Sequence, residues 1–165
     1  MIPVPTPLAG SALQVVLVNP EIAGNTGNII RLCANTGSSL HLVEPIGFSL
    51  EDKLLQRAGL DYHDLAEVQR HETWSACRSA LSGRTWWALT SRASQSYAHV
   101  PIGLDDVLVY GCESTGLPDD VLGEFPPEHR VRIPMRPNNR SLNLANSVAL
   151  VVYDVWRRAD FTGST

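Results

Sequence analysis

Residues 133–156 read IPMRPNNRSLNLANSVALVVYDVW, a polar loop followed by a strongly apolar segment. The apolar residues form two neighbouring stripes at helical spacing, Leu144, Val148, Val151, Val152 and Val155 in one and Leu142, Ala145, Ala149, Tyr153 and Trp156 in the other. This pattern predicts a helix that packs on two sides. Ser141 or Asn143 can cap its first turn by accepting backbone N–H bonds. Because the same turn offers donors and partial positive charge, the segment is either a capped core helix or part of a ligand site.

The length of 165 residues fits one domain with one hydrophobic core. A hydrophobic fraction of 44% and a charged fraction of 18% are typical of a soluble globular protein. No apolar run approaches the roughly 20 residues of a membrane-spanning helix. Residues 1–12 contain three prolines and no Lys or Arg, which argues against a signal peptide. We therefore expect a loose N-terminal extension over residues 1–12 and a single domain over residues 13–160.

The cysteines and histidines give no sign of a disulfide framework or a metal site. The three cysteines are odd in number and far apart, and the five histidines form no pair at metal-ligand spacing. This usage favours a reducing cytoplasm and a protein without a metal.

The net charge of −4 argues mildly against a protein that coats nucleic acid. However, four arginines fall within residues 130–140, and two more, Arg157 and Arg158, end the apolar helix. Such a cluster is either a solvated face or a local phosphate-binding patch.

Short apolar or β-branched runs alternate with helical patterns along the chain. Strands are predicted over residues 14–18, 40–44, 65–68, 85–90, 107–110 and 131–134, and helices over 25–37, 51–57, 72–81, 119–122 and from 144 onward. The alternation predicts an α/β domain with a mostly parallel sheet. In such sheets ligands bind at the carboxyl ends of strands, so the loops that begin at Asn19, Leu89, Gly111 and Pro134 are candidate site loops.

The predicted helix over residues 25–37 has an unusual polar face. An Asn or Thr is expected to cap its start, and Gly37 to end it. On a helical wheel its polar face comprises Asn25, Asn28, Arg31 and Asn35. Three amides and one guanidinium are suited to binding sugar and phosphate oxygens.

Several common catalytic motifs are absent from the sequence. There is no Gly-x-Gly-x-x-Gly after the first strand, no Gly-Lys-Ser/Thr and no Gly-x-Ser-x-Gly. Three other segments stand out in order, NTGNIIR at 25–31, GCESTGLP at 111–118, and IPM at 133–135 with SLNLAN at 141–146. Together they resemble the SpoU-type branch of the SPOUT RNA 2'-O-methyltransferases over residues 13–158. DK at 52–53 and RAGLDYH at 57–63 resemble more narrowly its tRNA (cytidine(34)-2'-O)-methyltransferase subfamily.

The resemblance implies a SPOUT α/β-knot fold, in which helices flank the sheet and the C-terminal half forms a deep trefoil knot. It also implies a homodimer and S-adenosyl-L-methionine as cofactor, bound in the knot cleft. The cofactor contacts carried over from the family fall at Leu89, Thr90, Gly111, Ile133, Met135, Ser141 and Leu142.

The reaction implied by the resemblance is 2'-O-methylation of the wobble ribose, at cytidine or modified uridine 34, in the anticodon stem-loop of leucine tRNAs. Arg31 matches the arginine credited with activating the ribose hydroxyl. Because a guanidinium is a poor base, we expect Arg31 to orient that hydroxyl and stabilise the developing alkoxide. Asn25 would position Arg31 or the ribose, and Glu113, Ser141 and Asn143 would hold the neighbouring loops. Another tRNA position, ribosomal RNA, or a catalytically silent RNA-binding protein are the alternatives.

Overall fold

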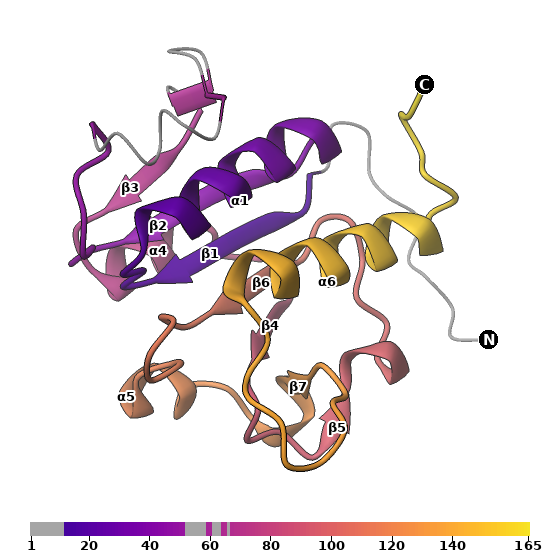
Figure 1. The fold of residues 1–165 in the computed structure, drawn as a ribbon. Helices are drawn as coiled ribbons and strands as arrows, with labels where there is room; N and C mark the ends of the chain where they lie inside the picture. Colours follow the sequence, from indigo (N-terminus) through magenta and orange to yellow (C-terminus); the bar gives the residue numbers. More distant parts are fainter. Residues whose placement is uncertain (1–11, 52–58, 61–63, 66) are drawn as a thin grey trace.

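The computed structural model of the protein describes residues 12–51, 59–60, 64–65 and 67–165 (Figure 1). The predicted N-terminal extension, except Ala12, lies outside the described residues. So do most residues of the two subfamily-like segments, at 52–53 and 57–63, and of the helix predicted over residues 51–57. The strands are β1 Gln14–Val18, β2 Ser39–Val43, β3 Gln69–His71, β4 Trp86–Leu89, β5 Gln95–Ser96, β6 Val107–Tyr110 and β7 Arg130–Arg132. The helices are α1 Ala23–Thr36, α4 Trp74–Ala80, α5 Asp119–Leu122 and α6 Leu144–Arg158, with 3-10 turns η1 Tyr97–His99 and η2 Pro127–His129.

The described strands form one sheet in the order β3-β2-β1-β6-β4-β7-β5. Every pair in it is parallel, which confirms the predicted α/β class. The carboxyl ends of β1, β6, β4 and β7 therefore meet along one edge of the sheet. Consecutive side chains of a strand point to opposite faces, so each central strand contributes to two cores.

One core lies between the sheet and the pair α1 and α6, which run along the same face (Figure 1). Val15 and Leu17 of β1 are buried in it together with Val148, Val151 and Val155 of α6. The first apolar stripe of α6 is thus buried as predicted. In the second stripe Tyr153 is 41% exposed and Leu142 is 42% exposed, so this stripe is only partly covered in one chain.

The second core lies on the other face, where α4 and α5 cover the sheet. Val16, Val18 and Val109 alternate with the residues of the first core and pack against Cys77 and Leu81. Because both faces of the central strands are buried, these strands read as continuous apolar runs in the sequence.

Several element boundaries differ from the prediction. The strand predicted over residues 65–68 is wrong, since β3 occupies Gln69–His71. Residues 91–99, for which the sequence predicts no strand or helix, contain β5 and η1. Both strands are short and carry polar side chains, and β3 and β5 lie at the two edges of the sheet, where one face need not be apolar. Among the described residues no helix is long and apolar enough to cross a membrane.

Candidate active site

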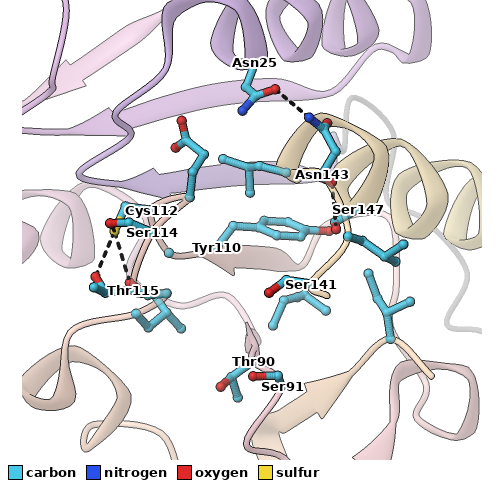
Figure 2. Close-up of a pocket in the computed structure, with 18 of the residues that line it drawn as sticks. Asn25, Thr90, Ser91, Tyr110, Cys112, Ser114, Thr115, Ser141, Asn143 and Ser147 are labelled. Carbon is cyan, nitrogen blue, oxygen red and sulfur yellow. Dashed lines mark hydrogen bonds between the residues drawn. The ribbon is translucent and has the colours of Figure 1, made fainter. Parts of the chain in front are cut away.

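A cleft of about 550 Å³ opens at the carboxyl ends of β4, β6 and β7, between the first turns of α1 and α6 (Figure 2). Its walls come from three predicted site loops, residues 89–92, 110–117 and 133–144. The fourth predicted loop, after β1, contributes Ile22, and the first turn of α1 contributes Asn25. The parallel sheet therefore brings together residues from Ile22 to Ser147, as expected for a ligand site at strand ends.

The cleft contains nearly all the residues predicted from the sequence. All seven predicted cofactor-binding residues line it, namely Leu89, Thr90, Gly111, Ile133, Met135, Ser141 and Leu142. Of the predicted catalytic residues, Asn25, Glu113, Ser141 and Asn143 line it as well. Arg31 is the exception, because it does not belong to the cleft wall.

Gly111 allows the loop after β6 to fold tightly against itself. A Cβ atom on Gly111 would lie 2.0 Å from the carbonyl carbon of Gly116 and 2.1 Å from the amide nitrogen of Leu117. Gly116 itself has a φ of 74°, in the left-handed region that favours glycine. The two glycines therefore allow the loop at 111–116 to close, and its backbone forms part of the cleft wall.

Glu113 binds the N-terminal end of α1. Its Oε1 accepts the backbone N–H of Glu21 at 3.1 Å, and its Oε2 accepts that of Ile22 at 2.5 Å. In return, Oε1 of Glu21 accepts both the backbone N–H of Ser114 at 3.2 Å and its hydroxyl at 2.5 Å. Hydrogen bonds from the Cys112 thiol and from Ser114 lower the pKa of Glu21. The loops after β1 and β6 are thus joined by two carboxylates, each of which accepts hydrogen bonds from the other loop.

The prediction that an Asn or Thr of its own first turn caps α1 is wrong. The helix begins at Ala23, its N-cap Ile22 makes no side-chain cap bond, and Asn25 and Thr26 lie buried inside the first turn. The carboxylate of Glu113, from another element, takes the place of a local cap. At the other end Gly37 has a φ of 71° and ends the helix as predicted.

Asn143 joins α1 to α6. Its Oδ1 accepts the backbone N–H of Asn146 at 3.1 Å, so it caps α6 as predicted. Its Nδ2 donates to Oδ1 of Asn25 at 2.9 Å (Figure 2). One amide side chain therefore fixes the first turn of α6 and holds it against the first turn of α1.

The polar face of α1 divides into two parts. Asn28, Arg31 and Asn35 are exposed, whereas Asn25 is buried at 9% exposure. At about 100° per residue, Asn25 lies roughly 120° around the helix from Arg31, which explains the difference. Nη1 of Arg31 donates to the carbonyl oxygen of Gly59 at 3.0 Å. The structure thus separates Arg31 from Asn25 by about 9 Å along the helix axis.

Some cleft residues were not predicted from the sequence. Tyr110 and Ser147 line the cleft, and the hydroxyl of Tyr110 is buried and finds no hydrogen-bond partner among the described residues (Figure 2). Burial raises the pKa of Tyr110 well above its usual value. Arg92 and Arg140 add positive charge to the wall. Tyr110 precedes Gly111 directly and Ser147 follows Asn143 by one turn, but in the sequence each looks like an ordinary strand or helix residue.

The arginine cluster is also divided by the structure. Arg132, Arg136 and Arg140 are exposed along the segment that leads into the cleft, and none of them forms an ion pair within the described part of the chain. Arg157 and Arg158 instead bind Asp154, at 2.9 Å and 3.2 Å. The side chain of Arg158 is only 8% exposed, so the predicted basic patch does not extend to the end of α6.

The described residues contain no group of three or more His, Cys, Asp or Glu that could hold a metal ion. All three cysteines are free, and burial raises the pKa of the Cys33 and Cys77 thiols to about 12. Neither thiol is therefore ionised at neutral pH. The polar groups available in the cleft are amides, hydroxyls, the Cys112 thiol, the Glu113 carboxylate and two arginines.

Comparison with known proteins identifies the family. A tRNA (cytidine(34)-2'-O)-methyltransferase of Methylovorus glucosotrophus (strain SIP3-4) is 58% identical over 151 residues, covering 92% of this chain and 98% of its own. A structure solved in work on the 2-OH methylation of C/U34 on tRNA is 38% identical, with a TM-score of 0.83, and the match covers 92% and 98% of the two chains. An AdoMet-bound rRNA methyltransferase from Sinorhizobium meliloti is 26% identical, with a TM-score of 0.76, over 88% of this chain and 56% of its own. Residues 12–153 match the SpoU rRNA Methylase family, and the chain belongs to that family.

Proposed function

We propose that this protein is an S-adenosyl-L-methionine-dependent methyltransferase that modifies the ribose 2'-hydroxyl of the wobble nucleotide of tRNA. The cleft supports this proposal most directly, because the three segments that resemble the family motifs converge on it. The 58% identity to a tRNA (cytidine(34)-2'-O)-methyltransferase over almost the whole of both chains supports the substrate. Leucine tRNAs carrying cytidine or modified uridine 34 are the proposed targets.

The cleft fits the cofactor in size and character. Its volume of about 550 Å³ lies in the usual range of roughly 300–1,000 Å³ for small-ligand sites. The tight loop at Gly111 leaves room and exposed backbone for a nucleoside, and Leu89, Ile133 and Leu142 offer apolar cover. When bound, S-adenosylmethionine supplies a methyl group on a sulfonium. Thr90, Met135 and Ser141 would complete the contacts from the remaining wall.

The chain's own residues would orient the ribose. Arg31 would hold the 2'-hydroxyl and the adjacent phosphate, and stabilise negative charge on the hydroxyl oxygen as its proton passes to water. Asn25 and Asn143 would fix the start of the two helices beside the methyl donor, as their 2.9 Å hydrogen bond favours. Glu113 and Ser141 would hold the cleft loops. The contribution of Glu113 would be positional, since it uses both oxygens on backbone N–H groups.

We further propose a homodimer, a C-terminal trefoil knot and a cytoplasmic location. Leu150 and Tyr153 of α6 and Leu142, just before the helix, are each more than 40% exposed, and a second copy would cover them. Arg31 lies off the cleft wall, so the ribose would be held between the cleft and α1 in the assembled dimer. The knot is proposed from the resemblance to the SPOUT family, and the single parallel sheet of the described strands is compatible with it.

The decisive experiment is methyl transfer to tRNA from a strain that lacks the gene, followed by mass spectrometry of the wobble nucleotide. We expect a mass gain of one methyl group at position 34. A methyl group at another tRNA position or in ribosomal RNA would reject the substrate assignment while keeping the chemistry. No transfer to any RNA, with no binding of S-adenosylhomocysteine, would favour a silent RNA-binding protein.

Arg31→Ala tests whether Arg31 acts in methyl transfer and not in cofactor binding. We expect turnover to fall by about 100-fold or more, because the alkoxide loses its electrostatic partner. The dissociation constant of S-adenosylhomocysteine should stay within about twofold, since Arg31 is outside the cleft wall. Arg70→Ala, at the far edge of the sheet, is the matched control. Normal turnover with weakened cofactor binding would contradict the assignment.

A further inference from the structure

The two reciprocal carboxylates, Glu21 and Glu113, are unusual in how they share their partners. Glu113 uses one oxygen for each of two backbone N–H groups at the start of α1. Glu21 uses a single oxygen, Oε1, for both bonds to Ser114. Glu113 and Ser114 line the cleft, whereas Glu21 does not. The sequence gives no sign of this pairing, because the partners lie 91 to 93 residues apart.

The pair forms a clasp, which we define as the carboxylates of Glu21 and Glu113 with the backbone groups of Glu21, Ile22 and Ser114 that they bind. The clasp connects the loop that carries Gly111 to the first turn of α1. Asn25 lies in that first turn and is already held to α6 by Asn143. The first turn of α1 is therefore fixed on both sides of the cleft, by the clasp and by one amide bond.

We propose that Glu21 is a positioning residue for methyl transfer, which acts through the clasp by holding α1, and with it Asn25 and Arg31, in register with the cofactor loop. Helix α1 has no side-chain cap of its own, so the bonds of Glu113 to Glu21 and Ile22 take the place of a cap, beside the bond from Asn143 to Asn25. A shift of about 1 Å between a catalytic group and the reacting atoms can reduce turnover by roughly 100-fold. The proposal rests on the proposed function only for its effect on turnover.

The geometry predicts different outcomes for two chemically identical substitutions. In Glu21→Gln the amide oxygen can still accept both bonds from Ser114, because both of these bonds go to the same oxygen, Oε1. In Glu113→Gln the amide NH₂ must replace one accepting oxygen, and it then faces a backbone N–H. Glu21→Ala removes both bonds to Ser114. A role that depends on negative charge alone would instead make both Gln variants equally defective.

The test measures kcat on tRNA and the affinity for S-adenosylhomocysteine in these three variants. We expect Glu21→Ala and Glu113→Gln to lose about tenfold or more in kcat, and Glu21→Gln to stay within about twofold. The dissociation constant for S-adenosylhomocysteine should change by no more than about threefold in Glu21→Ala, since Glu21 does not line the cleft. Glu72→Gln, an exposed residue before α4, is the control for the chemical change.

Hydrogen–deuterium exchange over residues 20–26 gives a readout that does not depend on the RNA substrate. We expect amides in this segment to exchange faster in Glu21→Ala and Glu113→Gln than in the wild-type protein. Glu21→Gln should match the wild-type protein in both exchange rate and thermal midpoint. Full kcat in Glu21→Ala, equal losses in Glu21→Gln and Glu21→Ala, or unchanged exchange in Glu113→Gln would each overturn the proposal. If the wild-type protein fails to methylate position 34 but exchange follows this pattern, the substrate assignment fails and the clasp stands.

Discussion

At Gly111 the absence of a single carbon atom decides whether the cleft can form. A Cβ atom there would lie within 2.4 Å of three backbone atoms of Gly116 and Leu117, and backbone cannot move aside as a flexible side chain can. Gly111→Ala should therefore open the loop, weaken S-adenosylhomocysteine binding by at least about tenfold, and lower the free energy of unfolding by roughly 1–3 kcal/mol. Calorimetric titration and urea unfolding measure the two effects.

Gly24→Ala is the control for the Gly111 substitution. Nothing lies within 4 Å of a Cβ atom at Gly24, which is in the first turn of α1. Alanine is favoured over glycine in a helix by up to about 1 kcal/mol, so this variant should be as stable as the wild type or more stable. Retained cofactor binding in Gly111→Ala would show that the loop closes by another route.

The sequence allowed individual cleft residues to be predicted where they belong to a recognisable motif. Leu89, Gly111 and Ser141 were placed by resemblance, and all three line the cleft. Glu21 and Tyr110 were missed for physical reasons. Glu21 binds a partner more than 90 residues away in the sequence. Tyr110 ends an apolar strand, so the sequence alone does not distinguish it from an ordinary core residue.

Helix α6 depends on one side chain for two separate contacts. Asn143 caps the helix through Oδ1 and binds Asn25 through Nδ2. Asn143→Ala removes both, and should lower the free energy of unfolding by about 1–2 kcal/mol. Asn143→Ser keeps a capping oxygen but has no amide to reach Asn25, so it should recover the capping part, about 1 kcal/mol. Urea unfolding of the two variants separates the contacts.

Turnover in the same variants distinguishes the cap from the bond between the helices. We expect Asn143→Ser and Asn143→Ala to lose similar factors in kcat, because both lack the contact with Asn25. Asn25→Ala, which leaves the α6 cap in place, should match them. If Asn143→Ser turns over as the wild type does, the cap alone matters and the contact between α1 and α6 has no role in catalysis.

Long buried elements were predictable, and edge elements were not. The runs that became β1 and β6 are apolar on both faces, and the α6 pattern has a capping residue at its start. In contrast, Gln69-Arg70-His71 forms β3 because its backbone pairs with β2, a tertiary contact without a hydrophobic pattern. The true start of α1 escaped prediction because Glu113 binds its first N–H groups from another loop.

The stability of the whole molecule should depend on the pH through a buried histidine of the sheet. His41 of β2 is 1% exposed, and its ring nitrogens lie 2.9 Å from Nε2 of His71 and 2.7 Å from Oε1 of Gln14. Desolvation, with smaller contributions from His71 and Arg84, lowers the pKa of His41 to about 4 from 6.5. As the pH falls, His41 takes up a proton in the unfolded chain at a higher pH than in the folded protein. The stability that depends on neutral His41 is therefore fully present above about pH 6.5 and falls as the pH drops toward 4.

The expected loss between pH 7 and pH 4 is about 3 kcal/mol from His41 alone. Desolvation also lowers the pKa of His71, which adds to the loss in the same direction. Urea unfolding at several pH values measures it, and His41→Gln should flatten the dependence. His99→Gln, at an exposed position, should leave it unchanged. A wild-type stability that is constant down to pH 4 would contradict the buried neutral pair.

An acidic protein can bind RNA if its positive charge is local. The chain carries 17 acidic and 13 basic residues, yet residues 130–140 contain four arginines and no acid. Arg132 and Arg136 are exposed and form no ion pair within the described residues, so they are available to phosphates. Arg140 reaches the cleft wall, which would bring a bound backbone up to the site of methyl transfer.

Binding of tRNA through this segment should weaken as the salt concentration rises, because the release of counterions from the phosphates then favours binding less. Each phosphate contact contributes about 0.7 to the slope of log K against log salt for a single-stranded loop. Arg132→Ala and Arg136→Ala should each reduce the slope by about that amount and leave S-adenosylhomocysteine affinity unchanged, since neither residue lines the cleft. Arg70→Ala, already paired with Glu44, should leave the slope as it is. An affinity that does not vary with salt, or equal slopes in all variants, would mean that the RNA is held by another surface.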